Sequence, residues 1–296
     1  LPMSFAVYRA TLLFDNPRAA ATATLLLNVM LMIAAGTVIV TPDAPLMVAS
    51  SFVLLCLAEL VATGRGAWWL AVGTAVGAAL VSKYTALFFG PAILIWLLAV
   101  PEAGRWLRSP WPYLGGIVSL AMFSPVLIWN SEHHWVSFAK QFGRARIHEW
   151  TLRYLIELLP TQVAFVTPLV FILAAMGLFA LWTRDDGTRA GRALINATVW
   201  TLTVYFIWHS LHGRVEANWF GPIYPALAIA AAVAAEVTRW QPRTQRVADV
   251  CRRWAAPVGV AMFIGLVVQV NTGLLSGYRR DASVRSIGVG WPELAA

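Results

Sequence analysis

The chain has 296 residues, of which 59% are hydrophobic and only 12% are charged, with a net charge of +8 and 15 tryptophans. A soluble domain of this length could not bury so much apolar surface, and a disordered chain would contain far less of it. The basic residues are dispersed between apolar runs, which excludes a nucleic-acid-binding stripe. Two cysteines far apart in the sequence exclude a disulfide scaffold. The composition is that of a polytopic membrane protein.

Apolar runs close to the thickness of a bilayer core predict the membrane-spanning helices. The run 66–100 is too long for one span and has Lys83 near its middle, so it predicts two short helices that meet at Ser82–Lys83. We therefore expect an all-α, polytopic integral membrane helical bundle with about nine transmembrane helices. Residues 1–275 would form the transmembrane domain and 276–296 a short polar tail. The other predicted spans are 19–40, 44–60, 112–129, 161–182, 193–208, 219–235 and 255–275.

The distribution of Lys and Arg predicts the orientation of this bundle. With the run 66–100 divided in two, one side of the membrane carries thirteen basic residues and the other carries nine, of which three belong to the tail. The more basic side is predicted to be cytoplasmic. Four polar segments then lie on the opposite side, at 41–43, 82–84, 130–160 and 209–218. Because ionisable groups at a bilayer boundary tend to mark functional cavities, this convergence predicts a site there.

Asp43 lies between two predicted helices in the segment Thr-Pro-Asp-Ala-Pro, with Pro45 expected in the first turn of the second helix. One interpretation is that Asp43 only caps that helix, which requires no more than a side-chain oxygen. The other is a carboxylate that acts as a base, a metal ligand or a hydroxyl acceptor. Both interpretations are compatible with the sequence.

Lys83 and Arg214 are the basic residues of two other polar segments. Lys83 would either extend to lipid headgroups or bind a lipid-linked phosphate. Arg214 and Glu216 would either form a weak exposed pair or belong to a site in which the guanidinium binds phosphate. In the second case Asn218 and Tyr224 would orient sugar or phosphate oxygens.

The segment 130–160 predicts an interfacial amphipathic helix, because its aromatic residues recur at helical spacing. The basic side chains of Lys140, Arg144 and Arg146 would then meet lipid phosphates. The adjacent His133 and His134 point to different faces of a helix and do not complete a metal-ligand set.

Six short motifs follow one another in register along residues 1–235: TPDAPL at 41–46, SKYT at 82–85, SPWPY at 109–113, FSPVLIWN at 123–130, HxWxS at 133–137 and RVEANW at 214–219. In this order they resemble the bacterial polyprenyl-phosphate-dependent glycosyltransferases with the GT-C fold. That group includes protein O-mannosyltransferase-like enzymes and the lipid A aminoarabinose and galacturonic acid transferases.

The resemblance implies a glycosyltransferase that moves a sugar, with inversion, from a polyprenyl-phosphate donor at the periplasmic face of the bacterial inner membrane. The acceptor would be lipid A, a polysaccharide or a protein, and membrane lipids would be further partners. Asp43 matches an acidic position associated with metal or acceptor positioning, which makes it the candidate catalytic residue. The implied donor- and substrate-binding residues are Lys83, Tyr84, His133, Arg144, Arg214, Glu216, Asn218 and Tyr224.

The sequence departs from this family in one respect. Its members carry an Asp, usually in an Asp-Glu pair, in the first periplasmic loop, and no residue here corresponds to it. We therefore expect a fragment from which the N-terminal helices and that loop are missing. No cofactor is assigned, and a divalent metal stays open. The alternatives are a transporter or flippase for a lipid-linked anionic substrate, and a non-catalytic lipid-binding subunit.

Overall fold

A computed structural model describes residues 1–36, 41–144, 150–183 and 188–274, apart from the side chains of Phe142 and Arg144. These residues form helices joined by turns and short loops, without strands. The α-helices are α1 (Pro2–Phe14), α2 (Pro17–Asn28), α3 (Leu31–Gly36), α4 (Asp43–Thr63), α5 (Trp68–Ser82), α6 (Phe89–Ala99), α7 (Pro101–Gly104), α8 (Trp111–Glu132), α9 (Val136–Arg144), α10 (Arg153–Val166), α11 (Pro168–Thr183), α12 (Arg189–His209), α13 (Tyr224–Ala232) and α14 (Pro242–Thr272). Short 3₁₀ segments are η1 (Tyr84–Phe88), η2 (Arg105–Arg108) and η3 (Ala217–Ile223), and η4 (Val233–Val237) is a π-helical turn.

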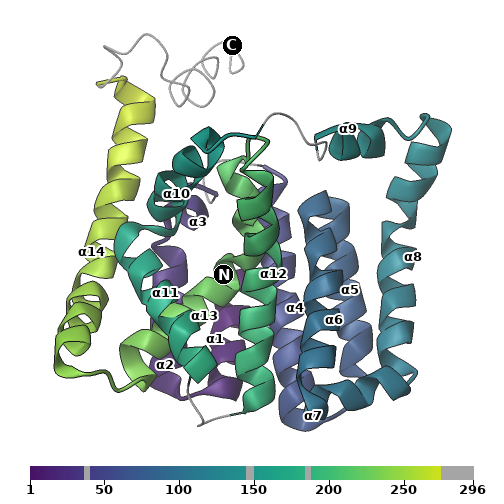
Figure 1. Ribbon diagram of the computed structural model, residues 1–296, viewed down its shortest axis with the longest axis horizontal. Coiled ribbons are helices and arrows are strands. Elements are labelled where there is room, and N and C mark those ends of the chain that lie inside the picture. The colour runs from purple at the N-terminus through teal and green to yellow at the C-terminus, as the bar shows by residue number, and fades with distance from the viewer. Residues whose placement is uncertain (37–40, 145–149, 184–187, 275–296) are drawn as a thin grey trace.

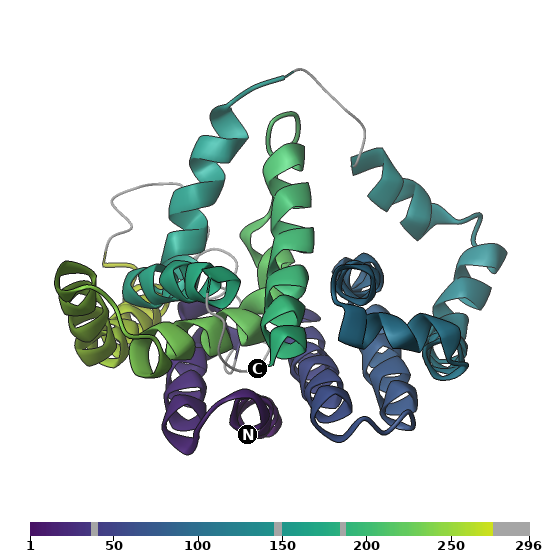
Figure 2. The same cartoon turned by 60° about the horizontal axis from the view of Figure 1, so that its bottom comes forward.

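The long helices stand side by side in one bundle, and α9 lies across its upper end (Figure 1). Helix α12 stands between α1, α2, α11 and α13 on one side and α5, α6 and α8 on the other (Figures 1 and 2). The buried apolar side chains form two clusters that correspond to these two groups. Helices α4 and α12 contribute to both clusters and join them.

The sequence of α4 explains where this helix begins and ends and why it is buried. Pro45 lies in its first turn, as predicted, where the missing N–H is not needed. Gly64 ends the helix with φ +64°, and its N–H donates to the Leu60 carbonyl at 2.9 Å. Since α4 packs against both clusters, it is apolar around most of its circumference rather than on one stripe. It therefore connects the two clusters.

Small residues let two other helix pairs approach closely. A Cβ atom on Gly73 of α5 would collide with the backbone of Gly115 on α8, and one on Gly115 would collide with the Trp69 carbonyl. A Cβ atom on Gly177 of α11 would likewise collide with the backbone of Ala230 on α13. Backbone contacts of this kind are typical of helix packing in membranes.

The predicted division at Ser82–Lys83 is confirmed. Helix α5 ends at Ser82, Lys83 is extended with φ −163° and ψ 142°, and η1 begins at Tyr84. The chain thus changes direction at the lysine, and α6 returns along the bundle (Figure 1). This turn positions the Lys83 side chain at the same end of the bundle as the start of α4.

Two predicted spans are wrong as single helices. The span 19–40 is interrupted after Val29, and the span 161–182 is interrupted at Thr167, where α10 and α11 meet at 100°. The two interruptions are in contact: the Thr167 hydroxyl donates to the Val29 carbonyl at 2.9 Å and accepts from the Leu31 N–H at 3.2 Å. The hydroxyl therefore satisfies backbone groups that the breaks leave free.

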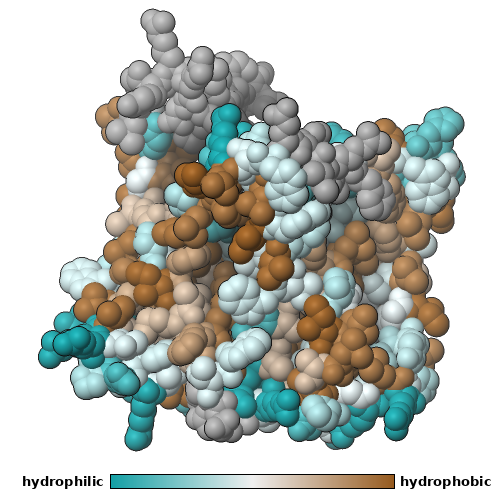
Figure 3. All heavy atoms as spheres, in the orientation of Figure 1, coloured by the Kyte–Doolittle hydropathy of each residue, from teal (hydrophilic) through white to brown (hydrophobic). Residues whose placement is uncertain are grey.

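Within the described residues, four single helices are long and apolar enough to cross a membrane, or six if each of two bent pairs forms one span. The sequence predicted about nine, because it treated shorter and broken helices as full spans. The surface is consistent with a bilayer environment: apolar side chains cover the middle of one face and hydrophilic ones gather along its lower edge (Figure 3). Ile117, Leu120 and Ile264 are each more than half exposed on the outer helices. The fold is an all-α membrane bundle, as predicted.

Candidate active site

Three of the predicted site residues meet at the upper end of the bundle. Asp43 is the first residue of α4, Lys83 lies in the turn between α5 and η1, and Asn218 lies in η3. They come from three of the four polar segments that the sequence predicted to converge. The structure brings them into direct contact.

Asp43 is the centre of this contact. The Lys83 ammonium lies 2.6 Å from Asp43 Oδ1, and the Asn218 side-chain amide donates to Asp43 Oδ2 at 2.9 Å. The interpretation of Asp43 as a helix cap is wrong, because Pro42 occupies the cap position and no side chain bonds the first turn. The carboxylate, only 3% exposed as a residue, instead binds a cation and an amide. We refer to Asp43, Lys83 and Asn218 as the acid cluster.

Lys83 is enclosed rather than extended toward headgroups, since its side chain is 21% exposed. A buried carboxylate is stabilised only if it is paired and fully hydrogen-bonded, and removing one partner is costly. Lysine is a compact charge on a flexible stem, so it can transfer its contact from a carboxylate to a phosphate.

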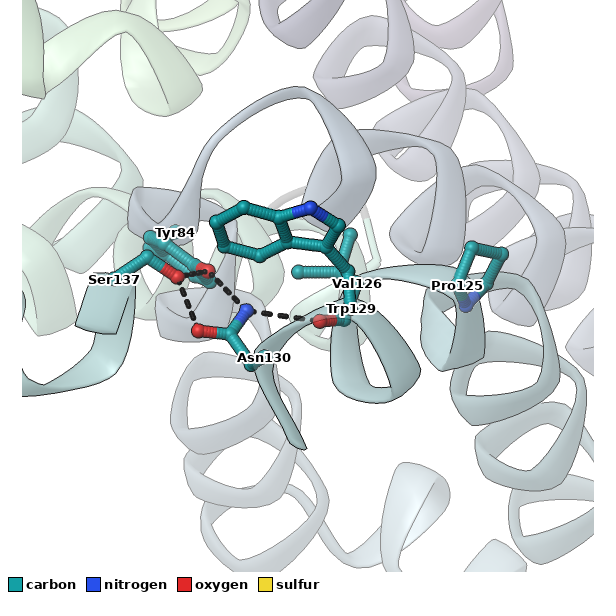
Figure 4. Close-up of a pocket in the computed structure, with 6 residues that line it drawn as sticks. All are labelled: Tyr84, Pro125, Val126, Trp129, Asn130 and Ser137. Atoms are coloured by element: carbon teal, nitrogen blue, oxygen red, sulfur yellow. Dashed lines mark hydrogen bonds between the residues drawn. The ribbon is translucent and has the colours of Figure 1, made fainter. Parts of the chain in front are cut away.

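A second polar network lies beside Lys83, and it holds α9 against α8. The Tyr84 hydroxyl and the Ser137 hydroxyl lie 2.7 Å apart, Ser137 also donates to Asn130 Oδ1, and the Asn130 amide donates to the Tyr84 hydroxyl at 3.4 Å. With Pro125, Val126 and Trp129, these residues line a cavity of about 450 Å³ (Figure 4). The cavity combines an apolar wall with a few polar groups, as small-molecule sites commonly do.

A third network lies behind the acid cluster. Gln162 of α10 donates from Nε2 to the Ala217 carbonyl at 2.8 Å, and its Oε1 accepts from the Tyr224 hydroxyl at 3.1 Å. Tyr224 is fully buried, so its hydroxyl is turned inward and not toward the cavity. Gln162 is not among the site residues that the sequence predicts. The signal that could have identified it is an uncharged polar side chain inside a predicted span.

Comparison with known proteins bears on the family and the fold. Residues 1–129 match the sequence profile of the dolichyl-phosphate-mannose-protein mannosyltransferase family, whereas no curated protein matches the chain. The solved structure of ArnT from Cupriavidus metallidurans bound to undecaprenyl phosphate is similar with a TM-score of 0.65 and 19% identity, over 90% of this chain and 55% of that one. The apo structure of the same protein gives a TM-score of 0.62 and 20% identity, over 93% and 48%.

The chain has the membrane fold of these ArnT structures. It spans about half the length of the solved structures that it matches. The resemblance predicted from the six motifs is therefore confirmed at the level of the fold. The profile match ends at Trp129, before α9 and η3, so the residues of those elements depend on the structural likeness.

Other residues that the sequence predicted for the site make no hydrogen bond or ion pair with the acid cluster in the described part of the chain. Arg214 is 68% exposed at its side chain, with Nε 3.8 Å from Glu157 Oε2, and Glu216 is exposed. The His133 ring is exposed and stacks on Trp129 with centroids 4.2 Å apart. Arg144 ends α9, and its side chain lies outside the described part of the structure. Their substrate-binding roles stay predictions.

Metal ligation was also left open by the sequence. In the part of the chain that the structure describes, no three His, Cys, Asp or Glu side chains are grouped so that they could hold a metal ion. The residues present in the acid cluster are one carboxylate, one ammonium and one amide. Because an ammonium repels a cation, this arrangement fits an anionic ligand better than a metal.

Proposed function

We propose that this chain belongs to a membrane glycosyltransferase that moves a sugar from a polyprenyl-phosphate donor to an acceptor hydroxyl. The observation that carries the proposal is the buried Asp43–Lys83 pair at one end of a GT-C fold. The likeness to ArnT bound to undecaprenyl phosphate supports the class of donor. Lipid A, a polysaccharide and a protein are the acceptors to test.

The donor phosphate would compete with Asp43 for the Lys83 ammonium. Transfer breaks the bond between the anomeric carbon and the phosphate oxygen, and negative charge accumulates on the leaving phosphate. A cation in a water-poor site stabilises that charge, so Lys83 would bind the leaving group. The polyprenyl phosphate would depart without needing a proton.

Asp43 would act on the acceptor. Once Lys83 has moved to the phosphate, the carboxylate loses its counter-charge and becomes a stronger base. It would accept the proton of the acceptor hydroxyl while the acceptor oxygen attacks the anomeric carbon from the side opposite the phosphate. This in-line geometry predicts inversion. Asn218 would keep Asp43 oriented throughout.

The distribution of basic residues supports a placement of this end of the bundle on the periplasmic side of the inner membrane. The apolar cavity beside Tyr84 lies next to Lys83 in the chain, and Asn130 and Ser137 supply polar groups at its wall. Tyr84 would thus contribute to substrate binding through this network rather than through the acid cluster.

The decisive experiment measures release of polyprenyl phosphate from a labelled lipid-linked sugar by the native full-length protein in detergent. Asp43→Asn keeps the shape of the side chain but removes the base, and we expect transfer to fall by about 10³-fold. The matched control is Asp249→Asn, an exposed residue of α14 that bonds only Gln245 of the same helix in the structure.

Turnover that Asp43→Asn retains would refute the role of Asp43. A wild-type protein that binds the lipid-linked sugar without releasing polyprenyl phosphate would instead identify a lipid-binding subunit. Movement of intact donor across the bilayer of proteoliposomes would favour a flippase. Each alternative predicts a different labelled species.

A further inference from the structure

The position of Asn218 depends on a neighbour that comes from another part of the chain. Asn218 follows Ala217 at the start of η3, a short 3₁₀ segment without a side-chain cap of its own. The Ala217 carbonyl accepts the Gln162 amide at 2.8 Å, across a separation of 55 residues. The start of η3 is therefore attached to α10 immediately before the residue that binds Asp43.

The orientation of the Gln162 amide is fixed from both ends. A carbonyl oxygen can only accept, so the Gln162 nitrogen must face Ala217. The Gln162 oxygen then faces the Tyr224 hydroxyl, which donates to it at 3.1 Å. Gln162 is 7% exposed and Tyr224 is fully buried, so water cannot easily replace either partner. The amide has one arrangement that satisfies both contacts.

These contacts continue directly to the carboxylate. Gln162 holds Ala217, the next residue is Asn218, and its amide donates to Asp43 Oδ2 at 2.9 Å. If the Ala217 carbonyl moved by one ångström, Asn218 would lose its hydrogen bond and Asp43 would keep only Lys83. A carboxylate with one partner can rotate. Its second oxygen would then no longer be fixed for proton transfer.

We infer that Gln162 is a positioning residue for Asp43, acting through Ala217 and Asn218 with Tyr224 as its support. The inference rests on the proposed function, since it names the residue that keeps the proposed base, Asp43, in its orientation. It assigns a role to the upper half of the α10–α11 pair, which the bend at Thr167 directs toward this end of the bundle (Figure 1). Gln162 itself does not touch the reacting groups.

The adjacent residue provides a matched control. Thr161 lies on the same helix, but its hydroxyl donates to the Glu157 carbonyl of its own helix. Thr161→Val removes a hydrogen bond from α10 without touching η3. Gln162→Leu removes the contacts to Ala217 and Tyr224 and keeps a side chain of similar size.

The test is carbodiimide-dependent labelling of carboxylates in the native full-length protein, quantified residue by residue by peptide mass spectrometry. We expect Gln162→Leu to raise the labelling rate of Asp43 about tenfold, the factor that corresponds to one lost hydrogen bond to a charged group. Glu59 and Glu236, buried at the other end of the bundle, report on global unfolding and should not change. Thr161→Val should leave all three rates unchanged.

The kinetic consequence separates positioning from stability. With a labelled polyprenyl-phosphate sugar, Gln162→Leu should lower kcat about tenfold and change the KM for the donor less than twofold. Lys83 still binds the phosphate in this variant, which is why donor binding is retained. Equal losses in kcat for Gln162→Leu and Thr161→Val would contradict the inference.

A second, milder variant tests the inference even if Gln162→Leu misfolds. Tyr224→Phe removes one hydroxyl, and we expect it to raise the labelling of Asp43 about threefold, with Glu59 and Glu236 unchanged. If Gln162→Leu raises the labelling of all three acids, the result for Tyr224→Phe decides whether the inference holds. Faster labelling of Asp43 alone supports the inference, whereas unchanged labelling, or faster labelling of all three acids in both variants, overturns it.

Because the labelling needs no donor, it still reports on Asp43 if the wild-type protein transfers no sugar. Failure of the proposed function and failure of the positioning role are therefore distinguishable. If the protein transfers no sugar but Gln162→Leu selectively raises the labelling of Asp43, the positioning role holds and the proposed function fails. If the protein transfers sugar but the labelling is not selective, the proposed function holds and the positioning role fails.

Discussion

Both ends of the bundle bury carboxylates, but they pair them differently. At the lower end Arg9 lies 3.0 Å from Glu59, which connects α1 to α4. Glu236 of η4 lies 2.7 Å from Arg18 of α2 and 3.3 Å from Arg252 of α14, and it also accepts the Thr22 hydroxyl at 3.1 Å. At the upper end Asp43 has one lysine and one amide.

The difference is in how easily each acid can change its partners. Three donors hold Glu236 at once, so an exchange there would require several contacts to break together. Glu59 is held by the planar guanidinium of Arg9, whose hydrogen-bond directions are fixed. Asp43 pairs instead with an ammonium, a compact charge on a flexible stem. The lower pairs therefore hold helices together, whereas the proposed function requires the upper pair to exchange one anion for another.

Among the variants that test this difference between the two ends, Lys83→Met should reduce sugar transfer the most. Methionine keeps the apolar length of the side chain but cannot bind phosphate, so we expect donor-dependent transfer to fall by about 100-fold. The measurement is kcat/KM for the lipid-linked sugar, together with binding of undecaprenyl phosphate. The residual turnover would reflect the remaining contacts of the donor.

Arg9→Met is the control, because it removes the cation from a carboxylate pair at the other end. It should reduce the thermal stability of the protein and leave the KM for the donor unchanged. A comparable loss of donor binding in both variants would show that the two kinds of pair do not differ in function.

Glu236→Gln should affect stability rather than transfer. Glutamine has the same size as glutamate but lacks the negative charge that pairs with Arg18 and Arg252. The side chains of these arginines are 70% and 40% exposed. Since exposed partners can be hydrated, we expect the free energy of unfolding to fall by only about 1–2 kcal/mol. Thermal unfolding in detergent measures this, with kcat of the folded fraction as the second readout. Strong loss of kcat at normal stability would contradict the assignment.

Part of the site could be predicted from the sequence, because ionisable residues stand out in apolar surroundings. Asp43, Lys83 and Asn218 were each identified, and the shared end of the bundle followed from counting spans. Their mutual contacts could not be predicted, since 40 residues separate Asp43 from Lys83 and 175 separate it from Asn218. Only the packing of α4 between the two clusters brings these segments together. Gln162 has a local signal, because it is an uncharged polar side chain in a predicted span, but its contact with Ala217 is also long-range.

The fold shows a similar limit. Hydropathy identified the apolar runs and the charge in the run 66–100 identified its turn, because both signals are local. The interruption at Thr167 has a local signal in Pro168, the first residue of α11. The interruption after Val29 depends on hydrogen bonds with Thr167, 138 positions away. A threonine in an apolar run can equally bond its own helix, as Thr201 does with Ala197.

Arg214→Ala should have the smallest effect of the series. The sequence predicts that Arg214 binds the donor phosphate, and the structure places it at the surface beside Glu157. An exposed guanidinium can attract an anion, but water and salt screen it, so we expect transfer to fall only about two- to threefold at low ionic strength. Raising the salt concentration should abolish this loss and leave the effect of Lys83→Met in place. Arg153→Ala is the matched control, because Arg153 pairs with the same Glu157 at 3.0 Å. If Arg214→Ala reduced transfer as strongly as Lys83→Met and independently of salt, Arg214 would have to reach the phosphate directly, and the contrast between enclosed and exposed cations at this end would be lost.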